Sequence, residues 1–298
     1  MNSREEVKAK VTKNGWNLRR ASDDLKNDKE IVMLAVSSYG PALQYASNNL
    51  RNDKDIVIRA VTKEGDAFGL ASENLRNDKE VATAAVKSCG FSLQYASEAL
   101  QNDKELVIMA IATDWHALQY ASLSLRDDKD VVSVAVQSDG SALHHASKDL
   151  RNEEEIVLKA IKSNALAIQY ASKSLQNNAT FLIAAVKVNP KVFNFIPSLI
   201  KKRENFCSEI IQAHSHNSEL ICEVICYHGK LIRFACETIK DDKNLVGIAV
   251  DSDGCALNYA SERLKKDYDL LPRALESCTL KGCYCIMIPL IKACTIST

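Results

Sequence analysis

The chain has 298 residues, of which 46% are hydrophobic, and its 38 Lys and Arg residues equal its 38 Asp and Glu residues. This balance argues against a nucleic-acid or anionic-membrane surface, which needs a basic excess, and the hydrophobic fraction argues against a disordered chain. No run of 18 apolar residues is present, and the start MNSREEVKAKV has no apolar core. We therefore expect no membrane span and no secretion signal, and we expect the ten cysteines to be reduced.

A period of 25 residues runs along most of the chain. The pair AS stands at residues 21–22, 46–47, 71–72, 96–97, 121–122, 146–147 and 171–172. An apolar residue precedes each of these alanines by three places, and a leucine follows each by four places. A fixed period of this length indicates a repeat architecture.

Each period has the pattern of two short helices. Asp28 suits an N-cap, because its carboxylate can accept from the first free backbone N–H groups of the helix. Apolar residues at helical spacing follow it, and Gly40 is expected in the left-handed position that ends a helix. A second helix is expected to carry Leu43, Ala46 and Leu50 on one face.

Helices of this length are marginal alone and must pack against their neighbours, which buries one continuous core. We therefore predict an all-α fold, an α-solenoid of about eleven 25-residue two-helix repeats with one irregular break. The predicted parts are a regular helical-repeat array over 1–188, an irregular segment over 189–223, and C-terminal repeats with a closing helix over 224–298. The closing helix is expected in the apolar stretch CYCIMIPLIKA.

The regular order falters after Asn189. Ile210 and Val224 both stand in the alanine column of the first helix, yet they lie 14 residues apart instead of 25. The missing 11 residues match the second helix and its turn. We predict that one helix is omitted here, leaving a notch with His214 and His216 at its mouth.

The pattern NDKEVVxxAVxxxGxxLQYAS resembles the bacterial and protist repeat family catalogued as domain of unknown function 4116. Its unit of about fifty residues would be two of the periods described above. The resemblance covers residues 15–188 and returns at 229–264. It implies helical repeats and brings no established activity and no catalytic residues. Trp115 and Ala165 stand where the pattern has glycine.

Two columns of side chains are candidates for a partner-binding surface. The column two places before the alanine is mostly glutamine and is predicted to face solvent, although glutamine also simply suits an exposed helix face. The column at the start of the second helix varies between repeats, as a recognition surface does, although such residues also pack as hydrophobic staples. Phe91, Trp115 and His116 are expected to form one aromatic patch. The predicted partner-binding residues are Trp16, Gln44, Phe91, Gln94, Trp115, His116, Gln119, His144 and Gln169.

A group of cysteines and histidines stands near the break. Cys222 and Cys226 are four apart on a helix, as metal ligands can be, and histidines precede and follow them. The alternative is that small reduced cysteines fill the core. We predict no metal and no cofactor, and the residues to examine for a metal are His214, His216, Cys222, Cys226 and His228.

Catalytic motifs for phosphate binding, nucleophile elbows or zinc proteases are absent from the sequence, so we expect no enzyme. The predicted function is a non-catalytic scaffold that binds another protein. The alternatives are a metal-regulated module at 207–228 and an RNA-binding helical repeat. We expect a protein partner, no nucleic acid and no membrane, with the oligomeric state left open. The expected location is the cytoplasm, or the host cytoplasm for an exported effector of a host-associated bacterium.

Overall fold

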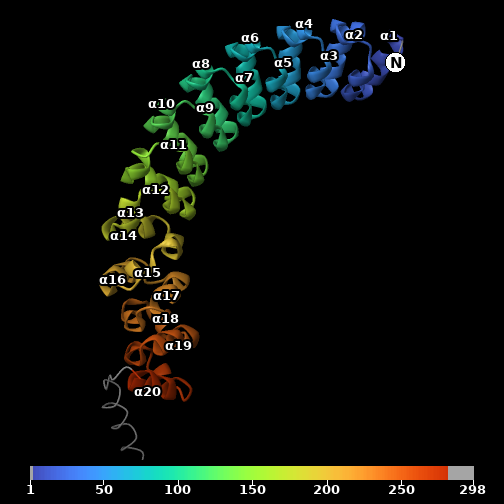
Figure 1. Ribbon diagram of the computed structural model, residues 1–298. Helices are drawn as coiled ribbons and strands as arrows, with labels where there is room; N and C mark the ends of the chain where they lie inside the picture. Colours follow the sequence, from blue (N-terminus) through green and yellow to red (C-terminus); the bar gives the residue numbers. More distant parts are fainter. Residues whose placement is uncertain (1–2, 281–298) are drawn as a thin grey trace, which may run out of the picture. The chain divides into compact units, whose positions relative to one another are not determined.

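The computed structural model describes residues 3–280, and its regular secondary structure in this range is helical, with no β-strand. The chain forms two compact units, unit 1 up to Tyr170 and unit 2 from Ala171. Each unit is a stack of similar rungs that follow one another in chain order (Figure 1). None of the described helices is long and apolar enough to cross a membrane. The predicted closing helix at CYCIMIPLIKA lies outside the described residues.

A typical rung contains three helices. A ten-residue α-helix comes first, a six-residue 3₁₀ helix follows, and a four-residue α-helix ends the rung, as in α3 (Lys29–Ser38), η2 (Gly40–Tyr45) and α4 (Asn48–Arg51). The predicted all-α repeat fold is therefore confirmed. The helix that opens a rung is α1 (Arg4–Lys13), α3, α5 (Lys54–Lys63), α7 (Lys79–Ser88), α9 (Lys104–Thr113), α11 (Lys129–Ser138), α12 (Glu154–Ser163), α14 (Ala179–Val188), α16 (Glu204–Ala213), α17 (Ser218–Ile225), α19 (Lys243–Ser252) or α20 (Leu270–Leu280).

The second half of a rung is less regular than the first. The six-residue 3₁₀ helices are η1 (Gly15–Arg20), η2, η3 (Gly65–Leu70), η4 (Gly90–Tyr95), η5 (Trp115–Tyr120), η6 (Gly140–His145), η8 (Ala165–Tyr170), η9 (Pro190–Phe195), η10 (Gly229–Phe234) and η11 (Gly254–Tyr259). The short helices are α2 (Asp23–Lys26), α4, α6 (Glu73–Arg76), α8 (Glu98–Gln101), α10 (Leu123–Arg126), α13 (Lys173–Asn177), α15 (Ser198–Lys201) and α18 (Glu237–Lys240), and the turns η7 (Leu150–Asn152) and η12 (Leu264–Lys266) take the same place in two rungs.

The expectation of a single second helix over Leu43, Ala46 and Leu50 is therefore wrong in its local form. Ala46 is extended, with φ −70° and ψ 155°, and separates η2 from α4. The next residue, Ser47, accepts a hydrogen bond from Leu50 N through its side chain and so begins a new helix. All three apolar side chains are nevertheless buried, as their columns predict.

The opening helix of each rung supplies most of the core. In α5, Ile56, Val57, Ala60 and Val61 are fully buried, and the corresponding residues of α3, α7, α9, α11 and α12 are likewise buried. The N-cap of α7 is an aspartate, as the repeat pattern predicts: Asp78 accepts from Glu80 N at 2.9 Å and from Val81 N at 3.1 Å.

A ladder of ion pairs joins the starts of successive long helices. In five places among the described residues, the lysine after an N-cap reaches the N-cap aspartate of the next rung and the acid two places beyond it. Lys54 illustrates this, with its Nζ 2.8 Å from an Asp78 oxygen and 2.7 Å from a Glu80 oxygen. The same arrangement links Lys29 to Asp53 and Asp55, Lys79 to Asp103 and Glu105, Lys104 to Asp128 and Asp130, and Lys243 to Asp267 and Asp269.

A second ladder joins the short helices. Ser97 N donates to Arg76 O at 3.1 Å, and the Ser97 hydroxyl donates to the Asn77 side chain at 2.6 Å. Ser72 makes the same two bonds to Arg51 O and Asn52, and Ser122 makes them to Gln101 O and Asn102. The AS pair therefore recurs because its serine both caps a helix and ties that helix to the preceding rung.

The repeat glycine recurs for a different physical reason from the one predicted. Gly40 and the other described glycines do not adopt the left-handed conformation. Instead, the glycine that begins a 3₁₀ helix lies against the backbone of the next rung. A Cβ on Gly90 would lie 2.1 Å from Ala110 O, and one on Gly140 would lie 2.1 Å from Ala160 O. Any side chain at these positions would force neighbouring rungs apart.

Gly140→Ala is expected to destabilise the protein by about 1–3 kcal/mol, because the new methyl group overlaps a backbone carbonyl that cannot move freely. Gln44→Ala, on the exposed side of η2, is the control and should change stability by less than about 0.5 kcal/mol. Chemical denaturation of both variants measures this difference, and equal stabilities would show that the rungs can separate at no cost.

Leu118→Ala should lower the free energy of unfolding by about 2–5 kcal/mol, because Leu118 is fully buried and truncation leaves a cavity. Gln119→Ala, one residue further along η5, should cost less than about 0.5 kcal/mol. Similar losses for the two variants in denaturant melts would show that the buried face of η5 is assigned incorrectly.

The ion-pair ladder predicts acid sensitivity. Hydrogen bonds from Lys54 and Lys79 hold the pKa values of the Asp78 and Asp103 carboxyls below their ordinary range. Because the folded pKa values lie below the unfolded value of about 3.9, this stabilisation is present above about pH 5 and is lost as the pH falls through the folded values. Thermal melts at several pH values should show a smaller acid-induced loss for Asp78→Asn/Asp103→Asn, whose asparagines retain the caps. An unchanged pH profile would assign the acid sensitivity to other groups.

Candidate partner-binding surface

Four successive 3₁₀ helices of unit 1 contain no Lys, Arg, Asp or Glu, although these residues make up 26% of the chain. These helices, η4, η5, η6 and η8, pack against one another in chain order. Residues three apart in a 3₁₀ helix share a face. The second residue of each helix therefore lies beside the fifth, which is glutamine or histidine, as Phe91 lies beside Gln94 in η4. We call the half-buried and exposed polar and aromatic side chains of these helices the uncharged ridge: Phe91, Gln94, Tyr95, Trp115, His116, Gln119, Tyr120, Ser141, His144, His145, Gln169 and Tyr170.

Aromatic rings of the uncharged ridge form two contact clusters. Phe91 meets Tyr120 of the next rung edge to face, with ring centroids 5.0 Å apart. Trp115 stacks on His116 at 3.6 Å and lies 6.4 Å from His145. No ring contact joins Phe91 to Trp115 among the described residues, so the rings predicted as one patch lie in two neighbouring clusters.

The second cluster continues into the last rung of unit 1. His144 lies 5.1 Å from the His145 ring and 5.1 Å from the Tyr170 ring. Burial, with smaller contributions from His144, His116 and Arg126, lowers the pKa of His145, which favours its neutral form. Asp114 accepts from His116 N at 2.9 Å, and its carboxylate lies 2.8 Å from His116 Nδ1, which holds that ring in place. The ridge is therefore aromatic and polar without carrying fixed charge.

Two predicted site residues lie outside the uncharged ridge. Trp16 belongs to η1, where it contacts Tyr39 and Tyr45 at centroid distances of 6.1 and 5.4 Å, with the Arg19 guanidinium 5.5 Å from its ring. Gln44 lies on η2, exposed, and donates to Pro41 O at 3.0 Å. Between them and the ridge stands η3, whose sequence GDAFGL carries an aspartate and no aromatic side chain on its outer face.

The ridge also contains a column that the sequence reasoning missed. Tyr95, Tyr120, His145 and Tyr170 each directly precede the alanine of an AS pair. Three of them, Tyr120, His145 and Tyr170, form ring contacts that link one rung to the next. The repeated sequence LQYAS could have revealed this column. An aromatic residue that recurs at one position of a repeat indicates that each copy has the same surroundings.

The rung pattern changes in unit 2. Helix α16 is followed directly by α17, with the turn at 214–217 in place of a 3₁₀ helix and a short helix. Ser215 O accepts from Cys236 N at 2.9 Å, which is the bond that a short helix makes in a regular rung. The turn thus supplies the backbone hydrogen bond that the missing short helix would have made. The side-chain packing of the missing 3₁₀ helix and short helix has no replacement in the turn.

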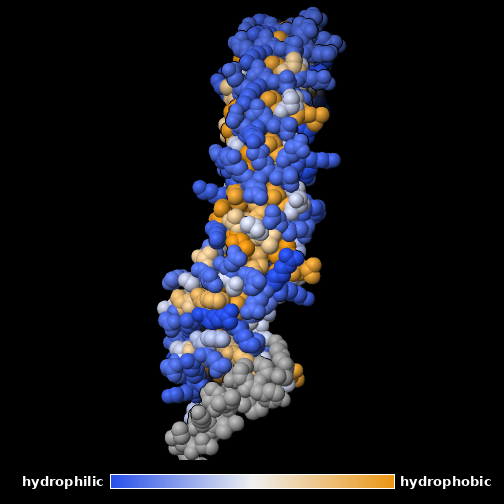
Figure 2. Space-filling model, turned by 90° about the vertical axis from the view of Figure 1, so that its left-hand side faces the viewer, coloured by the Kyte–Doolittle hydropathy of each residue, from blue (hydrophilic) through white to orange (hydrophobic). Residues whose placement is uncertain are grey.

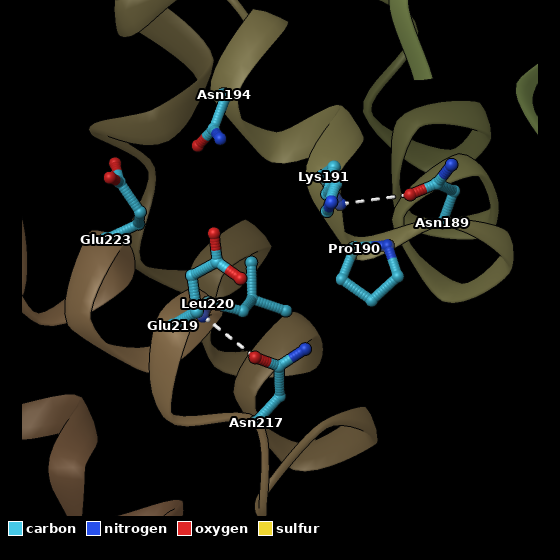
Figure 3. A pocket seen from close by; sticks show the side chains of 8 residues that line it. All are labelled: Asn189, Pro190, Lys191, Asn194, Asn217, Glu219, Leu220 and Glu223. Atoms are coloured by element: carbon cyan, nitrogen blue, oxygen red, sulfur yellow. Dashed lines mark hydrogen bonds between the residues drawn. The ribbon is translucent and has the colours of Figure 1, made fainter. Parts of the chain in front are cut away.

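A hollow of about 220 Å³ lies at this irregular rung (Figure 3). Residues of η9 and the one before it form one wall, and residues of α17 and its N-cap form the other. Its lining residues are Asn189, Pro190, Lys191, Asn194, Asn217, Glu219, Leu220 and Glu223. Neither His214 nor His216 lines it, so the expectation that these histidines stand at the mouth of the notch is wrong. We call this hollow the notch.

The cysteines and histidines near the break have separate surroundings. His228 Nε2 lies 3.1 Å from Lys201 O, His216 Nδ1 lies 3.1 Å from the Ser215 hydroxyl, and burial lowers the pKa of His214. Cys222 is half-buried and Cys226 is exposed. Within residues 3–280 no three His, Cys, Asp or Glu side chains are placed to hold a metal ion.

The expectation of reduced cysteines is wrong at one position. Cys255 takes part in a disulfide, whereas Cys89, Cys207, Cys222, Cys226 and Cys236 are free thiols. Burial raises the pKa of Cys207 to about 12, and its Sγ lies 3.0 Å from Lys201 O, so this thiol behaves as a core residue.

Apolar side chains gather near the notch. Figure 2 shows a largely hydrophilic face on which hydrophobic side chains collect at the level of α14. Val188, the last residue of α14, is 42% exposed, and Leu199 of α15 is 74% exposed. Serine, threonine or lysine stands at the position of Val188 in the seven preceding rungs, so an exposed apolar side chain at this position is particular to the rung of α14.

The model of the family described as Domain of unknown function (DUF4116) matches the chain at residues 3–51, 28–76, 53–101, 78–122, 103–151, 153–201 and 217–265. The chain belongs to this family. No curated protein and no solved structure matches it.

The seven matches overlap in steps that follow the rungs of the structure. Each DUF4116 match in residues 3–151 begins at the start of a long helix and spans about two rungs. The matches leave out residues 202–216, which hold α16 and the turn after it. The segment that departs from the family pattern is therefore the segment beside the notch.

Proposed function

We propose that this DUF4116 protein is a non-catalytic scaffold that binds another protein along the uncharged ridge. The observation that carries the proposal is the run of four 3₁₀ helices without a charged residue, combined with exposed rings and amides. The centres of protein interfaces are depleted in charged residues and enriched in Tyr, Trp and Phe.

The ridge suits a partner segment in an extended conformation. The glutamine column places amide groups beside the aromatic rings, and amides can both donate to and accept from a partner backbone. The rings supply large contact areas that lose little side-chain entropy on binding. A single-stranded nucleic acid would instead need a positively charged groove, and the four helices of the ridge contain no Lys or Arg.

Trp115 gives the sharpest test, because it occupies the position of the repeat glycine. Trp115→Gly restores the regular pattern of the rung and removes the largest ring of the ridge. We expect this variant to fold with an unchanged or higher melting temperature and to bind its partner at least about tenfold more weakly, as the loss of an interface anchor does.

The experiment is a proximity-labelling screen in the native host, followed by affinity measurement with the captured partner. Leu123→Ser is the matched control, because Leu123 is 76% exposed on α10 and lies outside the ridge. The control should keep the partner and its affinity. Equal partner capture and affinity for Trp115→Gly and the wild-type protein would contradict the proposal.

A further inference from the structure

The ion-pair ladder is interrupted between α16 and α17, beside the notch. One acid of α17, Glu219, has no basic partner there. In most regular rungs that have an acid two places after the N-cap, this acid receives a basic side chain from the preceding long helix: Lys54 lies 2.7 Å from Glu80, and Lys104 lies 2.9 Å from Asp130. Glu219 stands in this column, two places after the N-cap Asn217. In the preceding helix the lysine position is taken by Glu204.

Glu219 consequently forms no ion pair with any Lys or Arg in the part of the chain that the structure describes. Glu204 itself lies 3.7 Å from Arg233. Glu223, one helical turn after Glu219, also lines the notch and has no charged partner within 4 Å among residues 3–280. Glu219 and Glu223 thus line the same hollow from one helix, α17 (Figure 3).

Two lysines lie near these acids without neutralising them by contact. Lys201 is 6% exposed, and its Nζ lies 3.5 Å from Asn194 O and 4.7 Å from the centroid of the Phe193 ring. Burial lowers its pKa, which Glu223 partly opposes. Lys191 lies on the opposite wall of the notch and makes no ion pair with a described residue.

The size of the notch limits what can enter it. Its volume of about 220 Å³ is below the roughly 300–1,000 Å³ of sites for drug-sized ligands, and an additional helix needs far more room. Pro190 and Leu220 give it apolar contact surface, and the exposed Val188 adjoins it in sequence. A single long side chain with an apolar stem and a charged end fits these features.

We propose that the notch binds a lysine or arginine side chain from an extended segment of a partner protein. The positive charge takes the place of the missing ladder lysine at Glu219, with Glu223 as the second acceptor. The apolar stem lies along Pro190 and Leu220. The Lys191 ammonium and the Asn194 amide face the carbonyl oxygens of the same segment. This site is independent of the uncharged ridge and does not rest on the function proposed for it.

Peptide pools test the proposal directly on the full-length protein. Each pool contains acetylated and amidated nine-residue peptides with one fixed central residue, arginine, citrulline or glutamate, and a mixture of Ala, Ser, Asn, Pro and Leu elsewhere. Citrulline keeps the shape of arginine and lacks its charge. Capture on the immobilised protein is quantified for each pool at low and high salt.

We expect the arginine pool to be retained about two- to fivefold more than the citrulline pool at low salt, as a partly exposed ion pair provides. Glu219→Gln/Glu223→Gln should abolish this preference. The control Glu73→Gln/Glu98→Gln changes the net charge equally on two exposed short helices and should keep it. Trp115→Gly should also keep it, which separates this site from the ridge.

Two results would overturn the proposal. One is equal retention of the arginine and citrulline pools by the wild-type protein. The other is an arginine preference that survives in Glu219→Gln/Glu223→Gln, which would assign it to charge elsewhere on the molecule. Circular dichroism melts of each variant establish that the compared proteins are equally folded.

Discussion

Where a 3₁₀ helix begins with glycine, the backbone of one rung lies so close to the backbone of the next that no side chain fits between them. At Gly90 and Gly140 this contact is made by a main-chain carbonyl of an alanine twenty residues later. Because main-chain atoms set the spacing, the 3₁₀ helices stay aligned whatever side chains they carry on their outer face. The outer positions can therefore differ between rungs at little cost to stability, and this freedom is what makes the uncharged ridge possible.

Sequence reasoning succeeded where the determining interaction is local. The Asp28 cap and the buried columns follow from neighbours within one helical turn, so they were readable from spacing alone. The division of the second half-rung was not, because residues three apart, such as Leu43 and Ala46, share a face in both α and 3₁₀ helices. The bonds of Ser97 to Arg76 and Asn77 join residues twenty or more apart, which local patterns do not reveal.

The candidate sites show the same limit. Ile210 and Val224 are closer in sequence than the repeat period, and this spacing located the irregular rung. The walls of the notch come from η9 and α17, which lie about a full rung apart in the sequence. The histidines drew attention as unusual residues, while the lining side chains are ordinary ones. Pro197 explains part of the irregularity, since it stands in the serine column and has neither the N–H group nor the hydroxyl that ties a short helix to the preceding rung.

Trp115 stands at the repeat position that is glycine in most rungs. Its size affects which rungs can pack against each other when the chain folds. Rungs as alike as those containing LQYASNNLRND and LQYASLSLRDD offer nearly the same partners, so a slip by one or more whole periods, or an exchange of rungs between two copies, would preserve most contacts. A tryptophan cannot occupy a place where even a methyl group overlaps a carbonyl. A slipped array would have to fit this side chain at a glycine position, so one irregular residue penalises many of the wrong alignments that repetition otherwise permits.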